Sequence, residues 1–192
     1  MLKNKKANVV NGTIVVTLML FIFIFIFQVV NILTAGFTVR QRSNYSLSLL
    51  EASITQDIYS SLTEKNFDYY KELVLDTDKS MLKQEYNDLF FKILKENLNY
   101  NKSSNSYIGN YFEIENDSVI LNAVKNNDNS IKITLTMTVH YKTTFPFVNK
   151  QVDFIVKKMT VSSDYSFKDV VNENDDTNLI KGHTEGYGDK EL

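Results

Sequence analysis

The sequence predicts an α+β fold. One N-terminal transmembrane helix continues into a long helix, and a second amphipathic helix and a small antiparallel β-sheet follow. Three observations lead to this fold class. The first is an uncharged segment, Ala7 to Val39, that contains an almost wholly apolar run. The second is a spacing of three and four residues between apolar positions in two later stretches. The third is the strict alternation of apolar and polar residues from Ile131 to Tyr141.

The apolar run begins at Ile14 and extends through Phe27 to Leu33. At a rise of about 1.5 Å per residue, about 20 residues cross a hydrocarbon core roughly 30 Å thick. The alternating Phe-Ile repeat at 21–27 would favour a strand in water, but an isolated segment in lipid satisfies its backbone only as a helix. The sequence therefore predicts a basic leader at residues 1–13 and one transmembrane helix at residues 14–39.

The charges around this helix predict its orientation. Lys3, Lys5 and Lys6 precede the helix and favour a cytoplasmic N-terminus, although Arg40 and Arg42 follow it directly. We expect a single-pass protein of the cell membrane with an extracytoplasmic C-terminal part. Its expected partners are the lipid bilayer and other membrane proteins.

Three interpretations of residues 1–39 remain open: a permanent signal anchor, a cleaved secretory signal, and a processed leader. A secretory signal has an apolar region of about 7–15 residues, so this run is long for one. Its only exit with small residues is Thr34-Ala35-Gly36. A leader that ends in glycine directly before the helix would be cleaved between Gly12 and Thr13.

Two polar residues, Gln28 and Asn31, interrupt the outer end of the apolar run. At this depth they can lie near the lipid headgroups or form a hydrogen bond to another helix within the membrane. Gly36 is the only expected flex point near the membrane exit.

Residues 40–167 are expected to form one extracytoplasmic α+β domain that begins on the same helix. Apolar residues recur at helical spacing and no proline interrupts them, so the helix is predicted to run from about Val9 to Leu62. The apolar positions of its outer half are Leu47, Leu50, Ile54, Ile58 and Leu62. A second amphipathic helix is predicted from Lys79 to Leu98, with Thr77 or Asp78 as its N-cap.

The turn-rich stretch Asn99 to Ser106 separates the helices from the predicted strands. The strands are expected at Tyr107–Glu115, Ser118–Lys125, Ile131–Tyr141 and Val152–Val161. The third strand should be half-buried, with its apolar face on the helices and a face of threonines, Lys132 and His140 toward solvent or a partner. The alternation slips in the last strand, which indicates a bulge. Phe145-Pro-Phe147 is expected to form the corner before it.

Composition excludes several classes of function. The net charge is −2, and because three lysines lie in the leader, the part after Val39 carries −5, which argues against nucleic-acid binding. Cysteine is absent, so disulfides and thiolate chemistry are excluded. Residues 168–192 are acidic and almost without apolar residues, so we expect a disordered tail.

The motifs of common catalytic sites are missing, so we expect no enzyme, no cofactor, no metal site and no small-molecule substrate. No HExxH, GxSxG, Walker A or GxGxxG pattern occurs. His140 and His183 lack metal-ligand spacing. Glu113 and Glu115 share one strand face, as a pair of catalytic carboxylates would, but surface acids often alternate in this way.

The leader from Lys3 to Gly12, followed directly by a long apolar helix, resembles the leaders of type IV pilins, pseudopilins and TadE-like pilus proteins. The closing segments, from Ile131 through the Phe-Pro-Phe corner to Val161, resemble the end of TadE-like proteins and of small pilin-like proteins of conjugative elements in low-GC Gram-positive bacteria. At the fifth position after the glycine, where pilins usually carry a glutamate, this chain has Thr17. The resemblance implies a non-catalytic structural or assembly subunit of a pilus, secretion or conjugation apparatus, with other subunits as partners.

A second class of function stays open beside this one. The chain can equally be a generic membrane-anchored extracytoplasmic binding or accessory protein. In that case the threonine face of Ile131–Tyr141, or an edge of the sheet, would bind another envelope protein.

Overall fold

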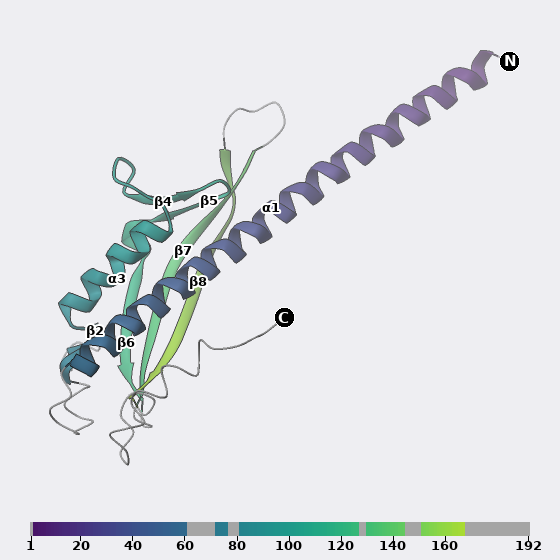
Figure 1. The fold of residues 1–192 in the computed structure, drawn as a ribbon. Helices are drawn as coiled ribbons and strands as arrows, with labels where there is room; N and C mark the ends of the chain where they lie inside the picture. Colours follow the sequence, from purple (N-terminus) through teal and green to yellow (C-terminus); the bar gives the residue numbers. More distant parts are fainter. Residues whose placement is uncertain (1, 61–71, 77–80, 127–129, 145–150, 168–192) are drawn as a thin grey trace, which may run out of the picture.

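The computed structural model describes residues 2–60, 72–76, 81–126, 130–144 and 151–167. Its longest element is helix α1 (Leu2–Ser60), which has 59 residues. Figure 1 shows α1 as a single rod: one end lies against the sheet and the other end projects away from the rest of the chain. The predicted continuous helix from the membrane segment into the domain is therefore confirmed up to Ser60, and Leu62 lies outside the described residues.

The other elements form the head of the molecule. They are β1 (Leu75–Asp76), β2 (Met81–Leu82), α3 (Gln84–Asn97), β3 (Tyr100–Asn101), β4 (Ser106–Gly109), β5 (Phe112–Glu115), the 3-10 helix η1 (Asn116–Ser118), β6 (Ile120–Lys125), β7 (Ser130–Thr144) and β8 (Gln151–Ser166). All strand pairs are antiparallel. The predicted α+β fold class is confirmed.

Strand β7 organises the larger sheet. Along one edge it pairs first with β6 and then with β5, which continues to β4 and β3. Along its other edge it pairs with β8 over its whole length, from Ser130 opposite Ser166 to Thr144 opposite Gln151. Strand β8 therefore lies at one edge of the sheet and reaches both ends of β7.

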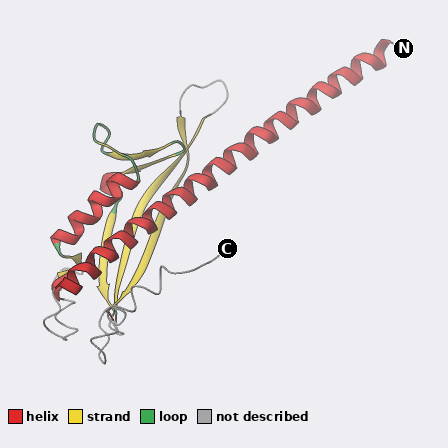
Figure 2. Cartoon of the chain, in the orientation of Figure 1, coloured by secondary structure: helices red, strands yellow, loops and turns green. Residues whose placement is uncertain are grey.

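The helices cover one face of this sheet (Figure 2). The apolar residues that alternate along β7 are all buried, and so are the outer positions of α1 from Leu47 to Ile58 that the helical spacing predicted. The predicted half-buried strand is therefore confirmed. Burial of this apolar surface is the main force that holds α1 to the sheet.

Helix α1 passes through Gly36, the expected flex point, without a break. Ala35 and Val39, on either side of it, are buried against the head. A Cβ atom on Gly36 would lie 3.2 Å from the hydroxyl of Tyr141, which is a tight contact. The glycine thus allows close approach of the sheet to a regular helix.

The second amphipathic helix begins at Gln84 and not at Lys79, and its N-cap is Lys83. Thr77 and Asp78 lie outside the described residues. The helix starts late because the chain first forms β2, which pairs with β1 and places Leu82 opposite Leu75. Both leucines are buried, so pairing and burial at this point outweigh helix propensity.

The first predicted strand, Tyr107–Glu115, is wrong as a single strand. It is a hairpin in which β4 and β5 pair across Asn110 and Tyr111, with Gly109 opposite Phe112. A Cβ atom on Gly109 would overlap the Phe112 ring, so a larger residue there would displace this ring. Asn99, between α3 and β3, and Asn105, in the turn before β4, have positive φ, a conformation that asparagine tolerates.

The slip predicted in the last strand is confirmed. Tyr141 pairs with Ile155, but Lys142 pairs with Asp153, so Phe154 is an extra residue on β8. The Phe145-Pro-Phe147 corner, His183 and the acidic tail at 168–192 lie outside the described residues.

Candidate functional site

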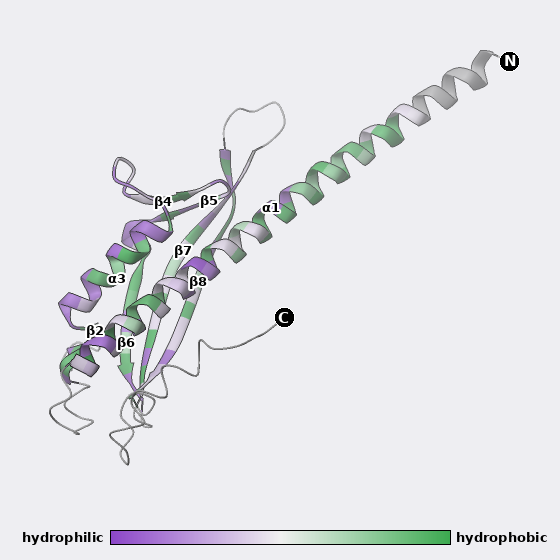
Figure 3. Cartoon of the chain, in the orientation of Figure 1, coloured by the Kyte–Doolittle hydropathy of each residue, from purple (hydrophilic) through white to green (hydrophobic). Residues whose placement is uncertain are grey.

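The N-terminal part of α1 is the largest apolar surface of the described chain. From Gly12 to Phe27 almost every residue is exposed, and Phe21 and Phe23 are 66% and 69% exposed. Figure 3 shows this part of the helix as strongly hydrophobic. It belongs to the one helix, among the described residues, that is long and apolar enough to cross a membrane. The structure is therefore compatible with a single N-terminal membrane anchor.

Gly12 and Thr13, the two residues of the expected leader cleavage, lie inside regular helix and are exposed. Thr17, at the position of the pilin glutamate, donates a hydrogen bond from its Oγ1 to the Thr13 carbonyl at 2.9 Å. Because that hydroxyl is satisfied by its own helix, it can lie in hydrocarbon without a partner from another chain.

The bare part of α1 ends at Gln28, which is buried. The Thr143 hydroxyl donates a hydrogen bond to the Gln28 side chain. The hydrogen bond thus joins Gln28 to the sheet of its own chain. Asn31, one turn further, is half-buried, and its Nδ2 has no partner within the described part of the chain.

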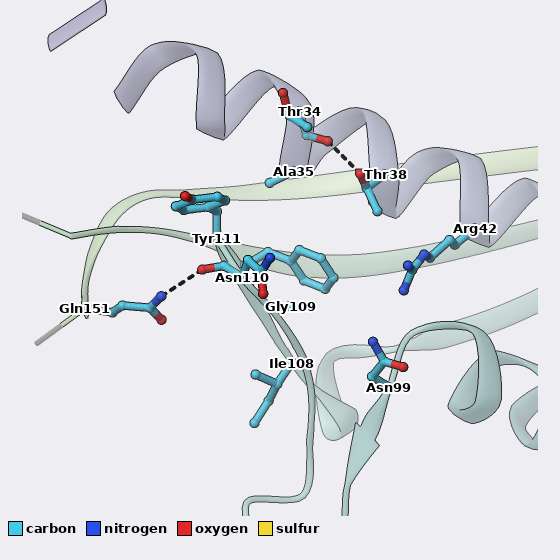
Figure 4. Close-up of a pocket in the computed structure, with 11 residues that line it drawn as sticks. Thr34, Ala35, Thr38, Arg42, Asn99, Ile108, Gly109, Asn110, Tyr111 and Gln151 are labelled. Carbon is cyan, nitrogen blue, oxygen red and sulfur yellow. Dashed lines mark hydrogen bonds between the residues drawn. The ribbon is translucent and has the colours of Figure 1, made fainter. Parts of the chain in front are cut away.

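An open groove of about 650 Å³ lies beside α1 just beyond this contact. Figure 4 shows Thr34 and Thr38 of α1 on one side and the β4–β5 turn with Tyr111 on the other. Gln151, at the start of β8, donates from Nε2 to the Asn110 carbonyl at 2.7 Å and so connects β8 to that turn. Hydroxyls, amides and the Arg42 guanidinium provide the polar groups of the lining, and no carboxylate or imidazole is among the described residues that line it.

Arg42 joins α1 to the end of α3. Its Nη1 donates to the carbonyl of Asn97, the last residue of α3, at 3.0 Å. The Asn97 amide donates in turn to Ser46 Oγ at 2.9 Å, and Ser46 donates to the Arg42 carbonyl. A cation at the C-terminus of a helix also interacts favourably with the helix dipole. Arg42 thus serves the packing of the head.

The acidic and histidine candidates lie on the outer face of the sheet. Lys142 Nζ donates to Glu113, and Ser106 Oγ donates to the same carboxylate at 2.9 Å. The hydrogen bonds from Lys142 and Ser106 hold the pKa of the Glu113 carboxyl below its ordinary value of 4.5. A general acid needs a raised pKa, so this environment does not favour an acid role for Glu113. Glu115 is exposed, and His140 Nδ1 lies 3.1 Å from Asp153 Oδ2.

The threonine face predicted on the third strand is the outer face of the sheet. Thr134 lies between Asn122 of β6 and Ser162 of β8, and Thr136 lies between Ile120 and Thr160. The two helices pack on the opposite face, so no described element covers these residues. The face carries small polar side chains and the exposed Ile120.

Comparison with family models, with curated proteins and with solved structures found no match. The class of protein is therefore defined by its fold and its surfaces alone. The protein is an α+β protein whose single N-terminal helix is suited to anchor it in a membrane.

Proposed function

We propose that this protein is a non-catalytic pilin-like or TadE-like subunit of a pilus, secretion or conjugation apparatus. The observation that carries the proposal is the two-part character of α1. From Gly12 to Phe27 the helix is bare and apolar, and from Val39 onward it is the spine of the head. We call the bare apolar segment the stalk. A subunit of this shape can hold its stalk in the bilayer before assembly and pack the same stalk against other copies after it.

Packing of apolar side chains would hold the stalks together in such an assembly. Exposed phenylalanine and isoleucine side chains on all sides of the helix must be covered by lipid or by protein. Neighbouring stalks can replace lipid around them. Since Thr17 is bonded to its own helix, this assembly has no charge pair at the position where pilins place a glutamate.

The proposed topology has the N-terminus in the cytoplasm and the head outside it. The three leader lysines favour this orientation. Arg42, which counted against it, donates to the end of α3 and is part of the head. Its position after the apolar segment therefore reflects the packing of the head.

Cross-linking in intact membranes tests the assembly. The chain has no cysteine, so introduced thiols are unique. Phe21→Cys and Phe23→Cys together place thiols about 200° apart around the helix, and both positions are exposed. Oxidation of the double variant should give a ladder of species larger than dimers. Each single variant is the matched control, because one thiol per chain gives dimers at most. A double variant that forms nothing larger than the single variants would contradict the proposal.

The N-terminus of the mature protein tests leader processing. A chain that begins at Thr13 supports cleavage after Gly12 and the prepilin-like route. A chain that retains Met1 favours an uncleaved anchor, and assembly would then depend on the cross-linking result alone.

The uncovered outer face of the sheet favours the alternative function, a membrane-anchored extracytoplasmic binding or accessory protein. A partner would then bind the row of Thr134, Thr136 and Thr138. In that case Thr136→Lys should abolish recovery of the partner from membranes and leave the stalk cross-linking of the double variant unchanged.

A further inference from the structure

The N-terminal end of β8 has an unusual exposure. All eight residues from Gln151 to Lys158 are exposed, although this segment is in a sheet and pairs with β7. Four of them are large and apolar; we call them the β8 patch: Val152 (37% exposed), Phe154 (40%), Ile155 (46%) and Val156 (52%). Because Phe154 is the bulge residue, apolar side chains project from both faces of this strand end.

The register places the β8 patch beside the exit of α1 from the bare segment. Val152 pairs with Thr143, and Thr143 is bonded to Gln28 of α1. Ile155 pairs with Tyr141, whose ring lies against Gly36. The patch therefore follows the two helical turns that come directly after the bare apolar segment. Figure 1 shows this end of β7 and β8 lying next to α1 where the helix leaves the head.

The apolar surface of α1 extends over the same stretch. Leu33 and Phe37 are each 68% exposed, and the first charged residue after the leader is Arg40. From Gln28 to Arg40 the helix rises about 18 Å. From Val152 to Lys158 the strand rises about 20 Å. Exposed apolar residues thus end, and exposed basic residues begin, at about the same level on two separate elements.

The charges of the strand end complete this arrangement. Lys157 and Lys158 are both exposed and directly follow the patch, as Arg40 follows the apolar helix. Asp153 is the one acid between Gln151 and Lys158, and its Oδ2 lies 3.1 Å from His140 Nδ1. Apolar and aromatic side chains with basic residues just beyond them are typical of proteins at the boundary between hydrocarbon and anionic lipid phosphates.

We propose that the β8 patch is a second membrane contact and lies in the interfacial layer of the bilayer beside α1. Arg40, Lys157 and Lys158 then lie at the level of the lipid phosphates. A single helix leaves the head free to rotate about the helix axis, and a second contact removes that freedom. This inference needs only the membrane anchor and holds whether or not the chain assembles into a filament.

The chain contains no tryptophan, so one introduced tryptophan reports on its own surroundings. Val156→Trp and Phe154→Trp place the reporter in the patch. Val124→Trp, on β6, is the matched control, because Val124 and Val156 have the same exposed fraction of 52%. The full-length variants are reconstituted in phosphatidylcholine vesicles with and without bromine on the upper acyl chain, and the fluorescence of each tryptophan is recorded.

The proposal predicts a blue-shifted emission for both patch variants and a loss of their intensity in brominated vesicles. Val124→Trp should show neither change. Emission of the patch variants that matches Val124→Trp in both vesicles would overturn the proposal. A blue shift without quenching by bromine would also overturn it, because protein, such as a second copy, would then cover the patch.

Discussion

Thr143, at the end of β7, donates a hydrogen bond to Gln28 of α1, 115 residues earlier in the chain. Both side chains are buried, so the contact joins the sheet to the helix where the bare apolar segment ends. It fixes the place on α1 where the head begins to contact the helix.

The first prediction concerns this contact. Gln28→Leu removes the acceptor of a buried hydroxyl, and we expect it to lower the free energy of unfolding of the head by about 1–3 kcal/mol. Chemical denaturation of the protein in detergent, followed by circular dichroism, measures the change. Thr143→Val added to Gln28→Leu should recover part of the loss, since no unpaired hydroxyl remains. Gln56→Leu, at an exposed position of the same helix, is the control and should leave the stability unchanged.

The second prediction concerns Gly36 and Tyr141. Alanine is favoured over glycine inside a helix by about 1 kcal/mol, but a methyl group at residue 36 would meet the Tyr141 hydroxyl at 3.2 Å. Without that hydroxyl the contact is absent, so the full stabilisation by alanine should appear. We expect Gly36→Ala to stabilise the Tyr141→Phe variant more than it stabilises the natural protein. Thermal unfolding of the four variants measures this coupling, and equal effects in both backgrounds would show that the two residues are not in contact.

The third prediction is a pH dependence. The folded-state pKa of Glu113 is lowered, so its contribution to stability is complete above 4.5 and is lost as the pH falls through the lowered pKa. We expect the unfolding free energy to fall with acidification in that window. Glu113→Gln should flatten the acid side of the profile, and Lys142→Met, which removes the principal partner, should flatten it in the same way. A profile that Lys142→Met leaves as steep as before would assign the effect to other carboxylates.

The fourth prediction concerns Arg42. Arg42→Ala removes the donor to the last carbonyl of α3, and we expect a loss of about 1 kcal/mol in the free energy of unfolding. Urea titration measures it. Arg40→Ala is a matched control, because Arg40 lies two residues away on the same helix and is exposed. Equal losses in the two variants would contradict a specific contact with α3.

Periodic apolar patterns predicted which face of a helix or strand is buried in the core. The stripe of α1 from Leu47 to Ile58 and the alternating face of β7 are buried as expected, because spacing alone decides which side chains share a face. The slip in β8 was also visible, since one extra residue changes the alternation for all residues after it.

Contacts between distant segments could not be predicted in this way. Nothing near Gln28 in the sequence indicates Thr143 as its partner, and nothing near Arg42 indicates the end of α3. The residues from Val152 onward predicted a strand with a bulge, but they gave no sign that the first half of this strand is exposed at the edge of the sheet. The exposure of a strand end depends on where the neighbouring elements end, and the local sequence pattern does not contain this information.

One unbroken helix, α1, carries both the bare apolar segment and the head. Spin labels on cysteines at Phe21 and Gln41, both exposed, enclose Gly36 and lie 20 residues apart, about 30 Å along a straight helix. Pulsed electron paramagnetic resonance in lipid nanodiscs should give one narrow distance distribution near that value. The pair Gln41 and Gln56, within the head, is the control and should give a narrow distribution near about 22 Å. A broad or clearly shorter distribution for the first pair, with a narrow control, would contradict the claim and show that the helix bends at the membrane exit.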